Sequence, residues 1–233
     1  MSNCIFAPVA VTRLPIAASD ALFPVHRVYC VGRNYREHAR EMGDSLREPP
    51  FFFSKPADAV CPDPVVPYPM MTADLHHEVE LVIALGSGGK NIKSDQALDR
   101  VFGYAVGVDL TRRDLQADAK KKGRPWTVAK GFDHSAPISA ICPVTECGHP
   151  NGASISLSVN GERRQHGNIS EMTWSVPEIV VELSRYFELQ AGDLIFTGTP
   201  SGVGALLPGD CVDCAIDTVG SLSFQISKAV ATF

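Results

Sequence analysis

Turn-forming residues interrupt this sequence too often for long helices, and the segments between them are short and rich in β-branched side chains. The 233 residues include 19 glycines and 17 prolines. This pattern favours a β-rich fold with few helices, because glycine and proline end regular elements and β-branched residues suit strands. The expected strands are residues 27–31, 51–54, 79–85, 101–108, 154–159, 194–196, 211–216 and 222–230. Asn160-Gly161, in NGER, predicts a tight hairpin turn after the fifth of them.

Three short helices are expected, at residues 35–42, 95–100 and 175–187. Ser94 is placed to cap the second helix, and Pro177 lies in the first turn of the third. The third helix has an apolar stripe that predicts packing on the core, formed by Ile179, Val180, Leu183 and Phe187. Because no repeat or linker divides the chain, we expect one domain over residues 1–233, with an N-terminal extension at 1–24 and a core at 25–233.

Charge and hydropathy narrow the class of protein. The formal net charge is −5 and the aromatic residues do not interleave with basic ones, which argues against nucleic-acid binding. No segment approaches the ~18 consecutive apolar residues of a membrane span, and no secretory signal is recognisable, so we expect a cytoplasmic protein without a membrane partner. The seven cysteines are expected to be reduced, and the C-x-x-C of Cys211 and Cys214 lacks the well-spaced second pair of a zinc site.

The stretch HHEVELVI places two glutamates, Glu78 and Glu80, at the head of an apolar strand. Side chains two apart share a strand face, so the carboxylates lie about 6–7 Å apart along the strand and repel each other as it enters the core. Either lysines pair with them at an exposed strand end, or a hard divalent cation binds them. Asp109, directly after a later apolar run, would supply a third ligand. Its rival Asp114 would be turned away by a helix that starts near Thr111.

Three further motifs contain residue types that could bind a metal, activate water or bind phosphate. His76 and His77 would allow a mixed histidine and carboxylate site, although hard cations favour oxygen ligands. His38 and Glu41, in REHARE, lie three residues apart in the first expected helix. They form either an exposed ion pair or a general base with its orienting carboxylate. The glycine-rich TGTPSGVG lacks the lysine of a phosphate-binding loop.

Six motifs, in order from about residue 25 to the C-terminus, resemble the fumarylacetoacetate hydrolase family, and most of all its fumarylpyruvate and acylpyruvate hydrolase branch. The motifs are YCVGRNYREHAREMG, FFFSKPADAV, HHEVELVIALG, GYAVGVDLTRRDLQ, GRPWTVAKGFD and LIFTGTPSGVG. The resemblance implies a mostly β fold with a few helices (α+β), built around a rolled mixed sheet, as a single catalytic domain and a homodimer. It also implies a Mg²⁺ or Mn²⁺ cofactor, with Ca²⁺ as a substitute in a crystal, bound by Glu78, Glu80 and Asp109.

The same resemblance implies roles for further residues. His38 and Glu41 match the catalytic pair, and Lys130 would neutralise the substrate carboxylate or a developing oxyanion. The residues expected to bind substrate are Arg33, Arg113, Gln116, Gly198 and Thr199. Arg112 is a rival for Arg113 by sequence alone. The lysines interpreted as solvated are Lys120, Lys121 and Lys122, and the histidines interpreted as structural or surface groups are His26, His76, His77, His134, His149 and His166.

The implied reaction is the metal-dependent hydrolysis of a C–C bond in a 2,4-diketo acid, with fumarylpyruvate giving fumarate and pyruvate. A cation bound to the pyruvate portion would stabilise the departing enolate, while His38 and Glu41 activate water. Two other activities fit the same pocket, namely decarboxylation of oxaloacetate and general hydrolysis of acylpyruvates. A non-catalytic protein that binds small dicarboxylates is the alternative from another class.

Overall fold

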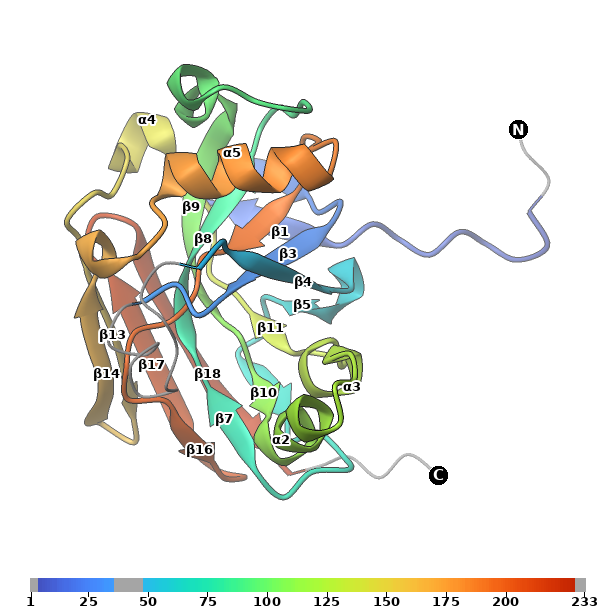
Figure 1. Ribbon diagram of the computed structural model, residues 1–233. Coiled ribbons are helices and arrows are strands. Elements are labelled where there is room, and N and C mark those ends of the chain that lie inside the picture. Colours follow the sequence, from blue (N-terminus) through green and yellow to red (C-terminus); the bar gives the residue numbers. More distant parts are fainter. Residues whose placement is uncertain (1–3, 36–47, 229–233) are drawn as a thin grey trace.

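The computed structural model describes residues 4–35 and 48–228. These residues form many short strands and few helices, which confirms the expected mostly β fold (Figure 1). The strands are β1 (Arg13–Ile16), β2 (Ser19–Pro24), β3 (Val28–Gly32), β4 (Phe51–Lys55), β5 (Val60–Cys61), β6 (Val65–Pro67), β7 (Leu75–His77), β8 (Val79–Leu85), β9 (Val101–Val108), β10 (Thr111–Arg112), β11 (Ala136–Pro137), β12 (Cys142–Pro143), β13 (Ser154–Val159), β14 (Glu162–Asn168), β15 (Leu194–Phe196), β16 (Gly204–Leu206), β17 (Cys211–Ile216) and β18 (Gly220–Ser227). The helices are α2 (Arg113–Lys121), α3 (Thr127–Lys130), α4 (Val144–Cys147) and α5 (Val176–Tyr186), with 3₁₀ turns η1 (Ala57–Ala59), η2 (Ser94–Gln96), η3 (Leu98–Arg100) and η4 (Ile169–Glu171). No helix in these ranges is long and apolar enough to cross a membrane.

Two mixed sheets form the body of the molecule. The six-stranded sheet has the order β12-β9-β8-β15-β3-β4, with β15 parallel to β3 and antiparallel to β8. The five-stranded sheet has the order β14-β13-β17-β18-β6 and ends in the parallel pair of β18 and β6. In Figure 1, β13, β14 and β17 lie on one side of the molecule and α5 lies across its upper end. Parallel and antiparallel pairs therefore occur in both sheets, as expected.

Strand β8 is buried on both faces. Its odd-numbered residues from 79 to 85 pack into the larger core, together with residues of the five-stranded sheet and α5. Val82 and Ala84 pack into a second core on the opposite face. Because side chains alternate along a strand, Glu78 and Glu80 lie at the head of the face that continues with these two residues. The glutamates are therefore carried into the interior by a strand that has no exposed side.

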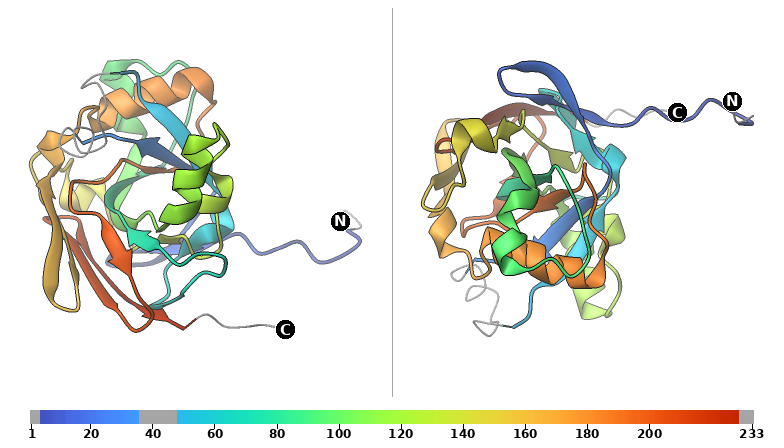
Figure 2. Two further views of the ribbon diagram at one scale, coloured as in Figure 1. Left: turned by 60° about the horizontal axis from the view of Figure 1, so that its bottom comes forward. Right: turned by 90° about the horizontal axis from the view of Figure 1, so that it is seen from above.

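A hairpin of β1 and β2 packs on the second core, within the segment expected to be an N-terminal extension. Its residues Leu14 and Phe23 are 0% and 6% exposed. Pro15, within the four-residue β1, obscures the alternating pattern that would otherwise predict a strand here. The view from above shows this hairpin along the outside of the body, with residues 4–12 extending away from it (Figure 2).

Most predicted strands are confirmed. The limits of β8, β9, β13, β15 and β17 agree residue for residue with the prediction. Strand β3 is shifted by one residue, β4 ends one residue later than expected, and β18 begins two residues earlier and ends at Ser227. The predicted turn connects β13 to β14, where Asn160 and Gly161 have φ values of 51° and 79°. Apart from β15, the strands of two or three residues are too short to show a period and were not predicted. The seven-residue β14 was not predicted either.

Helix α5 is confirmed to within one residue at each end. Ser175 precedes it and donates to Glu178 Oε2 through its N–H (2.9 Å) and its hydroxyl (2.7 Å). The helix expected at 95–100 is present as two short 3₁₀ helices, η2 and η3, which meet at the fully buried Ala97. Ser94 lies within the first of these turns and caps no helix.

Helix α2 begins at Arg113, two residues later than expected. Thr111 and Arg112 pair with β7 as strand β10, and this pairing keeps both residues extended. The helix expected at 35–42 lies outside the described residues, except for Tyr35, which forms an isolated β-bridge with Met172.

Candidate metal centre and its pocket

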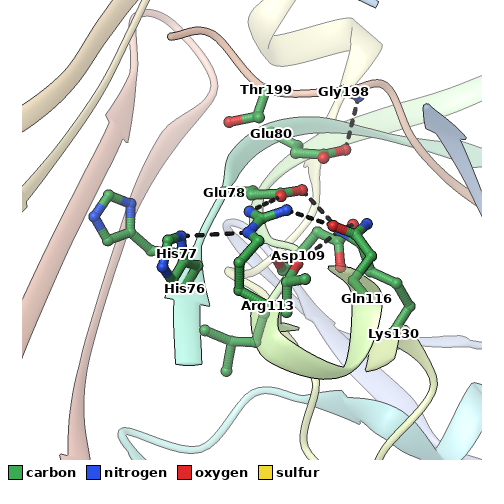
Figure 3. A network of polar contacts seen from close by, with 12 residues as sticks. His76, His77, Glu78, Glu80, Asp109, Arg113, Gln116, Lys130, Gly198 and Thr199 are labelled. Carbon is green, nitrogen blue, oxygen red and sulfur yellow. Dashed lines mark hydrogen bonds and ion pairs between the residues drawn. The ribbon is translucent and has the colours of Figure 1, made fainter. Parts of the chain in front are cut away.

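Three carboxylates meet where β8 and β9 lie side by side. Glu78 immediately precedes β8, Glu80 is its second residue, and Asp109 immediately follows β9. The strands pair antiparallel, and Asp109 N–H donates to Glu78 O (2.8 Å), which sets the start of one strand against the end of the other. One oxygen from each carboxylate lies within 4.8 Å of the others, and the residues are 6%, 2% and 1% exposed (Figure 3). Strand alternation and pairing register thus gather the three predicted ligands into one buried cluster.

The two glutamates have opposite electrostatic surroundings. Burial on its own raises the pKa of Glu78, but the charges of Lys130 and Arg113 outweigh it and hold this pKa well below its ordinary value. Burial also raises the pKa of Glu80, and the charges of Asp109 and Glu78 raise it further, so it lies well above its ordinary value. Within the described residues, Glu80 forms no ion pair. Its negative charge is therefore the one that most needs a cation.

Two buried lysines contact the cluster. Lys130, at the end of α3, donates to Glu78 Oε2 (2.8 Å), Asp109 Oδ2 (2.6 Å) and Thr111 Oγ1 (2.7 Å). Lys55, the last residue of β4, has its Nζ 2.8 Å from Asp109 Oδ1 and donates to the carbonyl of Lys130. Lys55 is not predicted to have a role from the sequence, although it lies in the motif FFFSKPADAV. The two lysines neutralise Glu78 and Asp109 and leave Glu80 without such a partner.

The cluster suits a hard divalent cation. Its donors are carboxylate oxygens, which Mg²⁺, Mn²⁺ and Ca²⁺ prefer as ligands. Asp109 Oδ1 is buried and accepts no hydrogen bond, so its contact with Lys55 is an ion pair without hydrogen-bond geometry. A cation held by the three carboxylates would satisfy this oxygen and would also compensate the charge of Glu80. The residues present therefore fit such an ion.

The two neighbouring histidines have other partners. His77 Nδ1 lies 2.9 Å from Gln165 Oε1, and His76 Nε2 lies 2.9 Å from Asp74 Oδ1. Burial is the largest cause that lowers the pKa of each histidine. Across residues 4–35 and 48–228, no group of three or more metal-ligating side chains includes either one. The mixed histidine and carboxylate site is therefore not supported.

Helix α2 presents Arg113 and Gln116 to the cluster. Arg113 donates from Nη2 to Glu78 Oε1, from Nη1 to Gln116 Oε1 (2.7 Å) and from Nε to His76 Nδ1 (3.3 Å), as Figure 3 shows. These bonds orient the guanidinium and use three of its five N–H groups. Both residues line the pocket that contains the cluster. Arg113 can thus hold Glu78 and still offer donors to a ligand.

The loop after β15 covers another side of the cluster. Gly198 N–H donates to Glu80 Oε2 (2.7 Å), and the Thr199 hydroxyl donates to Val79 O (2.7 Å). Both residues are predicted from the sequence to bind substrate. In the structure, these hydrogen bonds attach the loop to Glu80 and the start of β8. Gly198 has a φ of 96°, and a Cβ there would lie 2.8 Å from the Cβ of Asn34. Backbone conformation and available space both require glycine.

The two rival residues point away from the cluster. Asp114 accepts hydrogen bonds from Thr72 Oγ1 (2.6 Å) and Ala73 N (3.1 Å), as expected for a side chain turned away by α2. Arg112 donates to the carbonyl of Val128 (3.0 Å). Asp109 and Arg113, the residues preferred over these two rivals, both line the pocket.

The pocket has an aromatic wall. Phe51 and Phe53 of β4 lie edge-on to Trp126, with ring centroids 5.3 and 5.7 Å from it. The guanidinium of Arg33 lies 5.6 Å from the ring centroid of Phe51, and Lys120 Nζ lies 5.2 Å from that of Trp126. Arg33 is therefore at the pocket, as expected. The interpretation of Lys120 as a solvated lysine is wrong, because this side chain is only partly exposed and lines the pocket.

Two other sequence features add nothing to this geometry. His38 and Glu41 lie outside the described residues, so their role stays a prediction. Cys211 is exposed and Cys214 is buried, on opposite faces of β17, so the C-x-x-C does not form one site.

The fold and the site together define a mixed-sheet protein with a buried three-carboxylate centre in a pocket lined by cations and aromatic rings. Residues 27–227 match the family described as "Fumarylacetoacetate (FAA) hydrolase C-terminal". The crystal structure of fumarylpyruvate hydrolase from Pseudomonas aeruginosa, in complex with Mn²⁺ and pyruvate, is 54% identical, with a TM-score of 0.95 over 97% of this chain and 100% of that one.

Two relatives carry other names. The mitochondrial oxaloacetate tautomerase FAHD1 of Rattus norvegicus is 43% identical over 87% of this chain and 92% of its own length. The mitochondrial oxaloacetate decarboxylase of Dictyostelium discoideum is 42% identical over 82% and 88%. This chain belongs to the fumarylacetoacetate hydrolase family. The resemblance that the six motifs indicate is thereby confirmed.

Proposed function

We propose that this chain uses Mg²⁺ or Mn²⁺ to hydrolyse a C–C bond in 2,4-diketo acids, and that fumarylpyruvate is its main substrate. The observation that carries the proposal is the buried cluster of Glu78, Glu80 and Asp109, with Lys130 and Arg113 beside it. The similar Pseudomonas aeruginosa fumarylpyruvate hydrolase, described with Mn²⁺ and pyruvate, supports both the cation and the product.

Glu78, Glu80 and Asp109 would hold the cation. When bound, it supplies a Lewis acid that favours negative charge on the substrate oxygens. Lys130 holds its ammonium at Glu78 and Asp109, where it can also stabilise negative charge that develops on the substrate. Arg113 keeps two N–H groups for the pyruvate carboxylate, in a planar arrangement that suits two oxygens.

The reaction consumes one water. Its oxygen attacks the carbonyl carbon of the acyl group, with His38 as general base and Glu41 as the carboxylate that orients it. The bond from that carbon to the adjacent methylene breaks, and its electron pair passes to the methylene carbon, which takes up a proton. The acyl group leaves as a carboxylate and the other fragment as pyruvate. The assignment of His38 and Glu41 rests on the family motif in which they lie.

An assay of pyruvate release tests the proposal. The protein is incubated with Mn²⁺ or Mg²⁺ and, separately, with fumarylpyruvate, acetylpyruvate and oxaloacetate, and each reaction is repeated in excess EDTA. We expect release from fumarylpyruvate that stops in EDTA and returns when Mn²⁺ is added back. Equal rates with and without EDTA would exclude the cation, and no release from either acylpyruvate would exclude the hydrolase.

A matched pair of variants links this activity to the cluster. Asp109→Asn removes a proposed ligand, and Asp114→Asn makes the same chemical change five residues away, on a side chain that points elsewhere. We expect Asp109→Asn to reduce the rate by more than the ~10–100-fold that loss of an outer-shell partner causes. Asp114→Asn should keep its rate within about twofold. Similar losses in both variants would show that the effect does not come from the cluster.

Chemistry on oxaloacetate is the second candidate, because two relatives above 40% identity are named for it. Decarboxylation requires no attacking water, so His38→Ala should stop pyruvate release from fumarylpyruvate and leave release from oxaloacetate. Keto–enol exchange of oxaloacetate is measured separately, through the absorbance of the enol. If His38→Ala retains both activities, the proposed role of His38 in water activation is wrong.

The expected homodimer and the expected cytoplasmic location stay predictions. Light scattering coupled to size-exclusion chromatography measures the first. The second is open because both relatives named for oxaloacetate chemistry are described as mitochondrial.

A further inference from the structure

Three polar side chains of α2 lie along one face of the helix. Arg113, Gln116 and Lys120 are spaced i, i+3 and i+7, which places them on one stripe of an α-helix. All three line the pocket that contains the carboxylate cluster. The next two residues in the chain, Lys121 and Lys122, are exposed. Lys120 therefore faces the pocket, whereas Lys121 and Lys122 face the solvent.

Lys120 lies among other positive charges. Its Nζ lies over the ring of Trp126, and no carboxylate within residues 4–35 and 48–228 forms an ion pair with it. Burial lowers the pKa of Lys120, and the charges of Arg33 and Arg113 lower it further. A partly buried ammonium next to other cations gains strongly from an anion placed beside it.

The aromatic wall connects the carboxylate cluster to Lys120. Lys130, which contacts the cluster, has its Nζ 5.3 Å from the ring centroid of Phe53. Phe53 contacts Trp126, and Lys120 lies over Trp126. A flat unsaturated chain that starts near Lys130 can therefore lie against these rings and end near Lys120. Planar π systems pack well on aromatic faces and edges.

The pocket lining carries more positive charge than a substrate with one carboxylate can compensate. Among the described residues, three cationic side chains of the lining, Arg113, Lys120 and Lys130, accompany the three carboxylates. With a divalent cation bound, two positive charges remain in surplus. A dianion compensates twice as much of this surplus as a monoanion, and charge complementarity of this kind selects among ligands of similar shape.

We propose that Lys120 forms a second anion site that binds a terminal carboxylate on the acyl chain of the substrate. The preferred substrates are then acylpyruvates whose acyl chain ends in a carboxylate, in preference to those with a neutral alkyl end. This inference rests on the proposed function, because it concerns the acyl portion of the same substrate. It assigns Lys120 to specificity and not to bond cleavage.

The test compares two substrates in one set of variants. Lys120→Met keeps a long unbranched side chain against Trp126 and removes the charge, and Lys120→Arg keeps the charge. Lys121→Met is the matched control, since it makes the same change at the neighbouring exposed lysine. The measured quantity is kcat/KM for fumarylpyruvate and for acetylpyruvate with saturating Mn²⁺. Binding of both compounds to the Mn²⁺-loaded protein is measured in parallel by calorimetry under the same conditions.

We expect Lys120→Met to reduce kcat/KM for fumarylpyruvate by about 10- to 100-fold, the effect of losing one charge-assisted hydrogen bond. The value for acetylpyruvate should change less than about threefold, Lys120→Arg should recover most of the loss, and Lys121→Met should match the unmodified protein. Equal losses for both substrates, or none, would overturn the inference while the hydrolase function stands. If the unmodified protein cleaves neither compound, the proposed function has failed. The anion site is then tested by binding alone: tighter binding of fumarylpyruvate than of acetylpyruvate that is lost in Lys120→Met supports the site, and equal binding of both compounds contradicts it.

Discussion

Replacement of Lys55 tests whether the buried lysine stabilises the fold by compensating the charge of Asp109. Lys55→Met removes an ammonium whose Nζ lies 2.8 Å from Asp109 Oδ1 and which also donates to the carbonyls of Leu110 (3.3 Å) and Lys130. Lys55 is 3% exposed and Asp109 is 1% exposed. Methionine keeps a long unbranched side chain at this buried position and removes the charge. The variant therefore leaves a buried carboxylate with one counter-charge fewer.

The size of the effect follows from this burial. Removal of one partner of a buried ion pair costs about 3–5 kcal/mol, because the remaining charge stays desolvated. For a chain of this size, 1 kcal/mol lowers the melting temperature by about 2–4 °C, so Lys55→Met in EDTA should melt about 6–20 °C lower. A cation bound to Asp109 replaces part of the missing charge, since two unit charges ~4 Å apart near a protein surface interact by about 4 kcal/mol. In saturating Mn²⁺ the loss should therefore be smaller, by about 1–3 kcal/mol.

Thermal and urea unfolding, each in EDTA and in saturating Mn²⁺, measure both quantities. Lys121→Met is the control, because it removes a lysine of the same length from an exposed position, and it should stay within about 0.5 kcal/mol of the unmodified protein. Two results would refute the reasoning. One is a Lys55→Met variant as stable in EDTA as the control, which would mean that Asp109 does not depend on Lys55. The other is an identical loss with and without Mn²⁺, which would mean that no cation binds at Asp109.

Three further variants test other parts of the structure. Gly198→Ala should lose about 1–3 kcal/mol of stability, because alanine disfavours a φ of 96°. The variant should also bind Mn²⁺ more weakly, as measured by calorimetry. Unchanged stability would contradict the requirement for glycine in this loop. Asp193→Asn should lose about 1.5–3 kcal/mol in urea unfolding, because the buried carboxylate accepts from Arg27 Nε (3.0 Å) and Nη2 (2.8 Å), and a loss below about 0.5 kcal/mol would count against this pair. Burial raises the pKa of Asp114, but hydrogen bonds from Thr72 and the backbone outweigh it and leave the pKa below its ordinary value. A carboxyl group whose pKa is lowered by folding stabilises the fold at pH values above its unfolded pKa of about 3.9. The difference in free energy of unfolding between the unmodified protein and Asp114→Asn should therefore be full at pH 7 and shrink as the pH falls below about 4. A difference that does not depend on pH would exclude this contribution.

Features that depend on neighbours in the chain were predictable. Alternation placed Glu78 and Glu80 on one face of β8, and the length of the apolar run gave the limits of that strand. The position of Pro177 in the first turn of α5 and the turn at Asn160 follow from the same kind of local rule. These properties need only a few residues of sequence, because they come from backbone geometry that repeats every two or every 3.6 residues.

Residues whose role depends on distant segments were missed or misinterpreted. In the sequence, nothing distinguishes Lys55 from other lysines. Only the fold places its ammonium beside Asp109. Lys120 looks like one of three solvated lysines in DAKKKG, although its spacing from Arg113 and Gln116 puts all three on one helix face. The sequence shows that spacing. It does not show that this face of α2 lines a pocket, because that depends on how the helix packs.

Glu78 and Glu80 show the division most clearly. Residue type, strand period and spacing are the same for both. The sequence alone predicts that they share one strand face, and it leaves open whether that end of the strand is exposed or buried. Among the described residues, the fold pairs Glu78 with Lys130 and Arg113, whereas Glu80 accepts a hydrogen bond from a backbone N–H and lies beside two other carboxylates. Their pKa values therefore move in opposite directions. Periodicity is a property of adjacent residues, whereas an electrostatic environment is a sum over charges a few ångströms away in space. Those charges arrive from α2, α3 and β9, and only the packing of these elements decides where they lie.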